Sequence, residues 1–129
     1  MNLLLDTHVF LWSADARERL SDDARAAIES RDNDVFVSSA VAWEIAIKTR
    51  LGKLALPLDP PSYVASRMKA LGFRELAITF EHALSTGSLP AIHADPFDRI
   101  MIAQASIEGL TFVTRDARSL EYPISSLLA

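Results

Sequence analysis

Apolar residues occur along this chain in two patterns, short runs of strand length and longer stretches with helical spacing. Residues 2–5 form a short apolar run that ends at Asp6. Such continuous runs are typical of parallel strands that are buried on both faces, so this one predicts a central first strand. We expect further strands at residues 34–38 and 110–113, a short strand at 76–79, and an edge strand at 122–124.

The stretch from His93 to Asp116 gives the clearest helix prediction. Asp95 is a favourable N-cap residue, Pro96 suits the first helical position, and Gly109 suits the left-handed residue that follows a helix. Residues 97–107 between them are apolar on almost every side. A helix with that pattern is expected to be buried.

Five further helices alternate with the predicted strands. We expect one to begin at residue 9, and the others at residues 21–31 with Ser21 as N-cap, from an N-cap at Ser39 to Gly52, at 62–71 before Gly72, and at 80–86. Short loops join the elements. Alternation of strands and helices predicts an α/β fold with a mainly parallel sheet covered on both faces. At 129 residues the chain is expected to form a single domain, residues 1–129.

Composition excludes several classes of protein. The formal charge is −4, from 13 Lys and Arg against 17 Asp and Glu, so a nucleic acid would have to be held by local patches or by metal. The absence of cysteine excludes disulfides and thiolate metal sites. No signal peptide or run of membrane-spanning length is present, and we therefore expect a cytoplasmic protein without membrane association.

Acidic residues are predicted to gather at one edge of the sheet. A helix in an α/β layer runs antiparallel to its strand, so a helix start and a strand end lie at the same edge. Asp98 is in the first turn of the predicted helix and Asp116 follows the strand at 110–113. Asp6 follows the first strand, and Glu44 lies within the first two turns of the helix after the second. This carboxyl edge is where open α/β sheets bind ligands.

Four carboxylates in one place favour a hard divalent cation, Mg²⁺ or Mn²⁺, because both prefer oxygen ligands. Mg²⁺ keeps several waters and is usually completed by phosphate oxygens, which points to hydrolysis of a phosphodiester. Each acid alone has a structural explanation: Asp98 favours the helix dipole, and capping accounts for Asp95. It is the joint occurrence of four that favours a metal site.

Four segments carry a family resemblance that covers nearly the whole chain: LLLDTHVFLW, VSSAVAWEIAIK, DPFDRIMIAQA and GLTFVTRD. With these segments in this order, the chain resembles the PIN-domain ribonucleases and, within them, the VapC-like toxins of type II toxin–antitoxin pairs. The resemblance implies a compact three-layer α/β/α fold. It also implies Mg²⁺- or Mn²⁺-dependent endonucleolytic cleavage of RNA that leaves 5′-phosphate and 3′-hydroxyl ends.

The resemblance assigns metal binding and catalysis to the four acids: Asp6, Glu44, Asp98 and Asp116. Under it, Asp6, Asp98 and Glu44 hold one Mg²⁺ directly or through water, and Asp116 positions a second metal ion or the attacking water. Hydroxyl positions that support the acids match Thr7 and Thr114. The DPFD segment offers two acids for one family position, and helix register favours Asp98 over Asp95.

The resemblance also implies partners, namely an RNA substrate, a small VapB-like antitoxin and a second copy of the chain in a homodimer. One alternative is a nuclease outside any toxin–antitoxin system, acting in RNA processing or on DNA. A non-enzymatic receiver-type module is disfavoured, because it needs paired acids after the first strand, whereas Thr7 and His8 follow Asp6 here. Such a module also needs a lysine after its last strand, which this chain lacks.

Other candidate residues have simpler explanations. His8 and His93 flank the acidic edge, and packing or capping is expected for both. Trp12 and Trp43 are expected in the core rather than as platforms for bases. Two arginines near the acidic edge are candidates for phosphate contact, with solvated surface an equal alternative: Arg99 and Arg115.

Overall fold

The computed structural model describes residues 1–129 and contains one five-stranded sheet of order β3-β2-β1-β4-β5. All four neighbouring pairs are parallel. The strands are β1 (Leu3–Leu5), β2 (Val35–Ser38), β3 (Arg74–Leu76), β4 (Thr111–Thr114) and β5 (Ser126–Leu128). The predicted parallel sheet is therefore confirmed.

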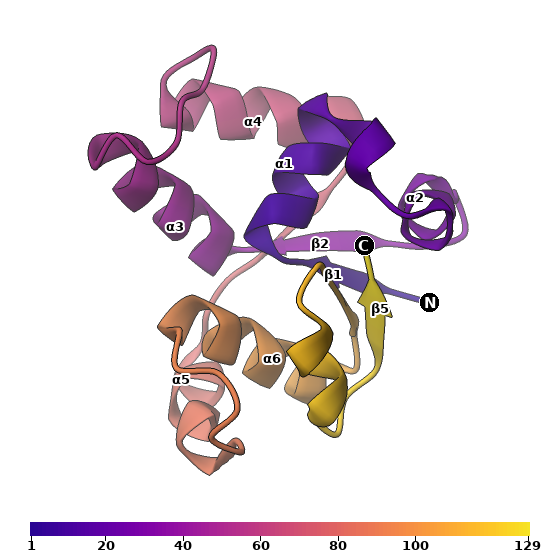
Figure 1. Cartoon of the computed structure of the whole chain (residues 1–129), viewed down its shortest axis with the longest axis vertical. Helices are drawn as coiled ribbons and strands as arrows, with labels where there is room; N and C mark the ends of the chain where they lie inside the picture. Colours follow the sequence, from indigo (N-terminus) through magenta and orange to yellow (C-terminus); the bar gives the residue numbers. More distant parts are fainter.

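Six α-helices cover this sheet: α1 (Thr7–Asp15), α2 (Asp22–Glu29), α3 (Ser39–Arg50), α4 (Pro60–Leu71), α5 (Phe80–Ser85) and α6 (Pro96–Glu108). In Figure 1, α1 and α4 lie above the strands, and α5 and α6 lie below them. The predicted three-layer α/β/α fold is confirmed by this arrangement. None of the helices combines the length and apolar character needed to cross a membrane.

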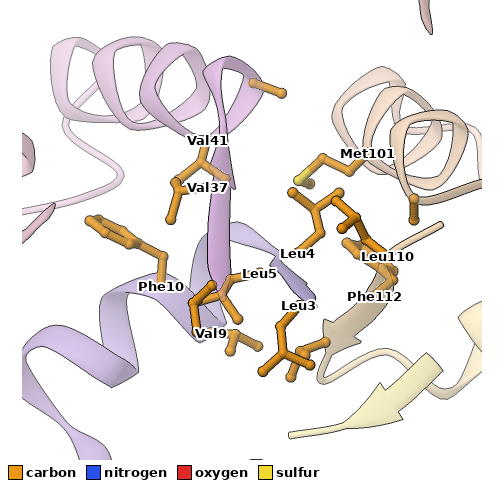
Figure 2. Close-up of a cluster of buried hydrophobic side chains, with 14 of the residues drawn as sticks. Leu3, Leu4, Leu5, Val9, Phe10, Val37, Val41, Met101, Leu110 and Phe112 are labelled. Carbon is orange, nitrogen blue, oxygen red and sulfur yellow. The ribbon is translucent and has the colours of Figure 1, made fainter. Parts of the chain in front are cut away.

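Strand β1 lies at the centre of the hydrophobic core, and its three leucines are completely buried. Side chains alternate between the two faces of a strand. Accordingly, Leu4 points towards Met101 of α6, whereas Leu3 and Leu5 point to the side of Val9 (Figure 2). Full burial of a leucine side chain contributes about 1.5–3 kcal/mol, so β1 is held firmly between both helical layers.

The capping residues predicted for α2 and α6 are confirmed. The Ser21 hydroxyl accepts a hydrogen bond from the backbone N–H of Ala24, and Asp95 accepts one from Phe97. Gly109 ends α6 in the left-handed conformation, with φ of 65°. These signals define α6 and thereby place Asp98 in its first turn.

Several predicted boundaries were wrong: α1 begins at Thr7 rather than residue 9, and α4 at Pro60 rather than residue 62. The third strand lies at Arg74–Leu76 rather than 76–79, because Thr79 caps α5. The edge strand is β5, not residues 122–124, since Pro123 lacks the N–H that a ladder requires. The N-cap of α3 is Ser38 rather than Ser39, and its hydroxyl accepts a hydrogen bond from Ala40.

The order of strand addition reverses between β1 and β4. From β1 the chain adds β2 and β3 on one side of the sheet, and then returns to add β4 and β5 on the other. Helices that follow β1 and β4 therefore diverge at this point, and such switch points are where open α/β sheets bind ligands. The acidic residues lie at the carboxyl ends of these strands.

Candidate active site

A cavity of about 150 Å³ opens at the carboxyl edge of the sheet, and no hydrophobic residue lines it. Its lining consists of Asp6, Thr7, His8, Glu44, Lys48, Asp95, Asp98, Arg115 and Asp116. The structure thus brings the four predicted acids together from four segments of the chain. Their roles in metal binding and catalysis stay predictions.

Asp6 is fixed at the end of β1 by two hydrogen bonds. One carboxylate oxygen accepts the backbone N–H of Val9 at 3.2 Å and so caps α1, and the other accepts the Thr114 hydroxyl at 2.6 Å. The residue is only 7% exposed. Burial raises the pKa of Asp6, and the hydrogen bonds from Thr114 and Val9 oppose that rise. Thr114 therefore holds the orientation of this acid, as the resemblance implied.

Glu44 is also buried, and both of its oxygens have partners. Oε1 accepts the Thr7 hydroxyl at 2.5 Å, and Oε2 pairs with the ammonium group of Lys48 one helical turn further along α3. A buried carboxylate needs such partners, because burying a lone charge is costly. Sequence reasoning did not assign Lys48 to the site, although its spacing from Glu44 is the ordinary spacing of a helical ion pair.

Asp98 differs from the other acids because its carboxylate gains no stabilisation from a hydrogen bond. Burial raises the pKa of Asp98 to about 6, with a further contribution from the charge of Asp95. The charges of Asp6 and Glu44 act in the same direction, and His93 opposes them. Asp98 is therefore the acid of the cavity that has most to gain from a cation.

Asp116 begins a short 3-10 turn and interacts with two basic side chains. The guanidinium of Arg118 donates to its Oδ2 at 2.8 Å, and Nε2 of His93 lies 2.9 Å from the same oxygen. Hydrogen bonds from Arg118, with help from His93, hold the pKa of Asp116 well below its usual range. The Arg118 side chain is 59% exposed, so it can be exchanged for another cation at small cost.

Arg99 contacts the backbone of its own chain, and its predicted phosphate contact stays a prediction. Its guanidinium donates to four backbone carbonyl oxygens of the segment before α6: those of Thr86, Leu89, Pro90 and His93. Both terminal nitrogens of the guanidinium are thus turned towards the protein backbone. Arg99 therefore fastens residues 86–93 and does not line the cavity.

The prediction that Trp43 belongs to the core was also wrong, since the residue is 58% exposed and packs edge-on against Phe97. Trp12 is half-buried, and the guanidinium of Arg115 lies 5.8 Å from its ring centroid. Arg115 is exposed and lines the cavity, so it stays a candidate for phosphate contact.

The donor chemistry of the cavity fits an open divalent-cation site. All its carboxylates offer oxygen ligands, yet no three carboxylate or imidazole groups lie close enough to enclose a metal ion. A zinc- or calcium-type cage is therefore a poor fit. Mg²⁺ is commonly bound through one or two carboxylates, with water and substrate oxygens completing its shell, and Asp6 and Asp98 fit that pattern.

Comparison with known families gives a match to the PIN domain over residues 3–123. Ribonuclease VapC22 of Mycobacterium tuberculosis (strain ATCC 25618 / H37Rv) is 32% identical over 118 residues, which cover 90% of this chain and 88% of that protein. Ribonuclease VapC16 of the same organism is 43% identical over 68 residues, which cover 50% of this chain and only 48% of that protein.

Solved structures share the fold at low identity. VapBC2 from Rickettsia felis, bound to a promoter DNA fragment, matches with a TM-score of 0.74 and 14% identity over 99% of this chain and 98% of that chain. DNA-bound VapBC from Salmonella typhimurium matches with a TM-score of 0.66 and 18% identity, covering 99% and 98%. At these identities the likeness is one of fold.

Proposed function

Because the chain belongs to the PIN-domain family, which it matches over residues 3–123, we propose that it is a metal-dependent endoribonuclease and the toxin of a type II toxin–antitoxin pair. The observation that carries this proposal is the cavity at the carboxyl edge, where four acids from distant segments meet among polar side chains only. The two ribonuclease relatives support RNA as the substrate. We propose that this activity acts in the cytoplasm.

In the proposed mechanism Asp6 and Asp98 would hold Mg²⁺, with Mn²⁺ as a substitute, and Glu44 would support them directly or through water. The cation would offset charge on the phosphoryl oxygens and lower the pKa of the attacking water. Thr114 keeps Asp6 facing the cavity, and Thr7 does the same for Glu44.

Two further groups act on the reactants themselves. Asp116 lines the same cavity as the helix acids and would orient the attacking water by accepting its hydrogen bond. Arg115 is exposed at the rim of the same cavity and would contact a phosphate of the RNA backbone.

The test is cleavage of total cellular RNA by purified protein in Mg²⁺, in Mn²⁺ and in EDTA, with cut ends mapped by sequencing. Asp6→Asn and Asp98→Asn each remove a charge at nearly constant shape and should abolish the cuts. Asp23→Asn, an exposed acid at the start of α2, is the matched control and should cut like the wild type. Cuts that persist in EDTA or in both site variants would reveal a contaminating ribonuclease, and no cleavage by folded wild type would contradict the proposal.

We also propose that the chain forms a homodimer through an apolar surface on α3 and α5. Trp43, Ile47 and Leu51 recur every fourth residue of α3 and the turn that follows it, and are 58%, 36% and 62% exposed. Phe80 and Leu84 on α5 are 90% and 79% exposed. Trp43 of α3 and Ala83 of α5 line one mainly apolar cavity of about 440 Å³, which lies between the two sets of exposed groups in the proposed interface. Exposed apolar patches of this kind mark protein interfaces.

Sedimentation of a Phe80→Ser, Leu84→Ser double variant tests this surface, because both side chains are exposed and their loss leaves the core intact. The wild type should sediment as a dimer and the variant as a monomer. A monomeric wild type at micromolar concentration would contradict the homodimer. A VapB-like antitoxin is the second proposed partner, supported by the VapBC structures that share this fold. Co-purification with the product of an adjacent small gene tests it.

A further inference from the structure

A buried hydrogen-bonded chain leads away from Asp116 into the protein. Nε2 of His93 lies 2.9 Å from Oδ2 of Asp116, and Nδ1 of the same ring lies 3.0 Å from the Tyr122 hydroxyl. His93 is 4% exposed and Tyr122 is 3% exposed. The two rings are stacked, with centroids 5.4 Å apart and planes 16° from parallel. Neither residue lines the cavity that holds the four acids.

The positions of the hydrogens between Asp116, His93 and Tyr122 follow from the number of available donors. The backbone N–H of His93 donates to the Tyr122 oxygen at 2.8 Å. The hydroxyl has a single hydrogen, and Nδ1 of His93 is the acceptor within its reach. Nδ1 therefore accepts, which places a ring hydrogen on Nε2, where it donates to Asp116.

The two basic partners of Asp116 differ in how easily they can move away from it. The Arg118 side chain is 59% exposed, whereas the His93 side chain is 1% exposed and packed against Tyr122. An RNA phosphate can draw Arg118 away, or a cation can replace it at Asp116, at little cost, whereas buried His93 stays in place. Carboxylates at metal and catalytic sites are commonly oriented by such buried donors.

We propose that Tyr122 and His93 are positioning residues, which lock the imidazole in the Nε2–H form and hold the Asp116 carboxylate towards the cavity when Arg118 is released. The catalytic part of this inference rests on the proposed nuclease function. The tautomer and its dependence on Tyr122 do not.

The first test is the ring ¹⁵N signature of His93 by long-range proton–nitrogen NMR on the metal-free protein. The wild type should show a protonated Nε2 and an unprotonated Nδ1. Tyr122→Phe should lose this pattern by shifting the ring towards a mixture of forms. Tyr63→Phe is the matched control, because it removes another tyrosine hydroxyl, one that donates to Asp15 far from His93, and should leave the signature unchanged. An Nδ1–H ring in the wild type, or a Tyr122→Phe spectrum identical to wild type, would overturn the proposal.

The second test separates kcat from KM in RNA cleavage. Loss of a positioning donor typically lowers activity by about 10–100-fold, so His93→Ala should lower kcat by that factor with little change in KM. His93→Gln keeps an N–H at the reach of Nε2 and should recover most of kcat. Equal losses in both variants would show that His93 acts through packing alone. If the wild type has the Nε2–H form but cuts no RNA, the nuclease proposal fails while the tautomer inference stands. If it cuts RNA with an Nδ1–H ring, the nuclease proposal stands and the tautomer inference fails.

Discussion

Replacing Asp98 by asparagine is expected to stabilise the metal-free protein while removing its activity. The folded protein raises the pKa of Asp98 from 3.8 to about 6, which sets an upper limit of about 3 kcal/mol on the cost of its charge. Asp98 is only partly buried, so solvent screening reduces this to about 1–2 kcal/mol. Asparagine also forgoes about 0.5 kcal/mol of favourable interaction with the helix dipole. The net gain in the free energy of unfolding at pH 7.5 is about 1 kcal/mol, or about 3–5 °C in Tm.

The gain must depend on pH in a definite direction. Between about pH 4 and pH 6 the folded wild type binds more protons than the unfolded chain, because the folded pKa of Asp98 is the higher one. Its stability therefore falls as pH rises through this window, and the full cost applies above it. At about pH 4 the folded carboxyl is almost fully neutral and the unfolded one is close to half neutral. Asp98→Asn lacks this slope, so most of its advantage should be lost at pH 4.

The assay is urea denaturation followed by circular dichroism in EDTA, at pH 7.5 and at pH 4. Asp23→Asn is the control, since that acid also lies in a first helical turn but is exposed, and its effect should stay within a few tenths of a kcal/mol. Added Mg²⁺ should stabilise the wild type more than the Asp98 variant, because only ligands bound by the folded state shift stability. An Asp98 variant no more stable than wild type at pH 7.5, or equally stabilised at pH 4, would refute the reasoning.

Three other substitutions probe the elements that surround the site. Arg99→Lys should loosen residues 86–93, because an ammonium cannot reach four carbonyl oxygens, and hydrogen exchange should speed up there; unchanged exchange would contradict the fastening role. Lys48→Met should cost about 2 kcal/mol by leaving the buried Glu44 charge without its cation, and adding Glu44→Gln should restore most of the loss in urea denaturation. Gly109→Ala should lower the free energy of unfolding by about 1 kcal/mol through the φ of 65° alone, because open space surrounds the added Cβ. The control Gly87→Ala, at a position without positive φ, should be neutral. Equal effects would show that backbone strain is not the cause.

Local signals in the sequence predicted the fold well. The capping residues Ser21 and Asp95 and the terminal Gly109 interact with their own helices, so their roles depend on few distant contacts. The last strand was misplaced because Tyr122 has strand-like character, yet its hydroxyl is used by His93, which is distant in sequence.

The candidate site was predictable in its acids and less so in their partners. Strand ends and helix starts share an edge by topology, which brought the acids together without any knowledge of side-chain packing. The ion pair of Arg118 with Asp116, and the four carbonyl contacts of Arg99, depend on loop conformation. Trp43 was misassigned because periodicity marks an apolar face without saying whether this chain or another covers it.

The hydrogen bond between Thr114 and Asp6 joins residues 108 positions apart, and β1 pairs with β4 over the same span. On the ribosome, a growing chain would therefore hold Asp6 long before the residues that orient it are synthesised. No fragment that stops before Thr114 can close the central pair of strands or assemble the four acids. Contacts of such long range also slow folding. The topology thus confines any activity of this edge to chains whose synthesis has passed Asp116, which leaves a partner time to be present when the site forms.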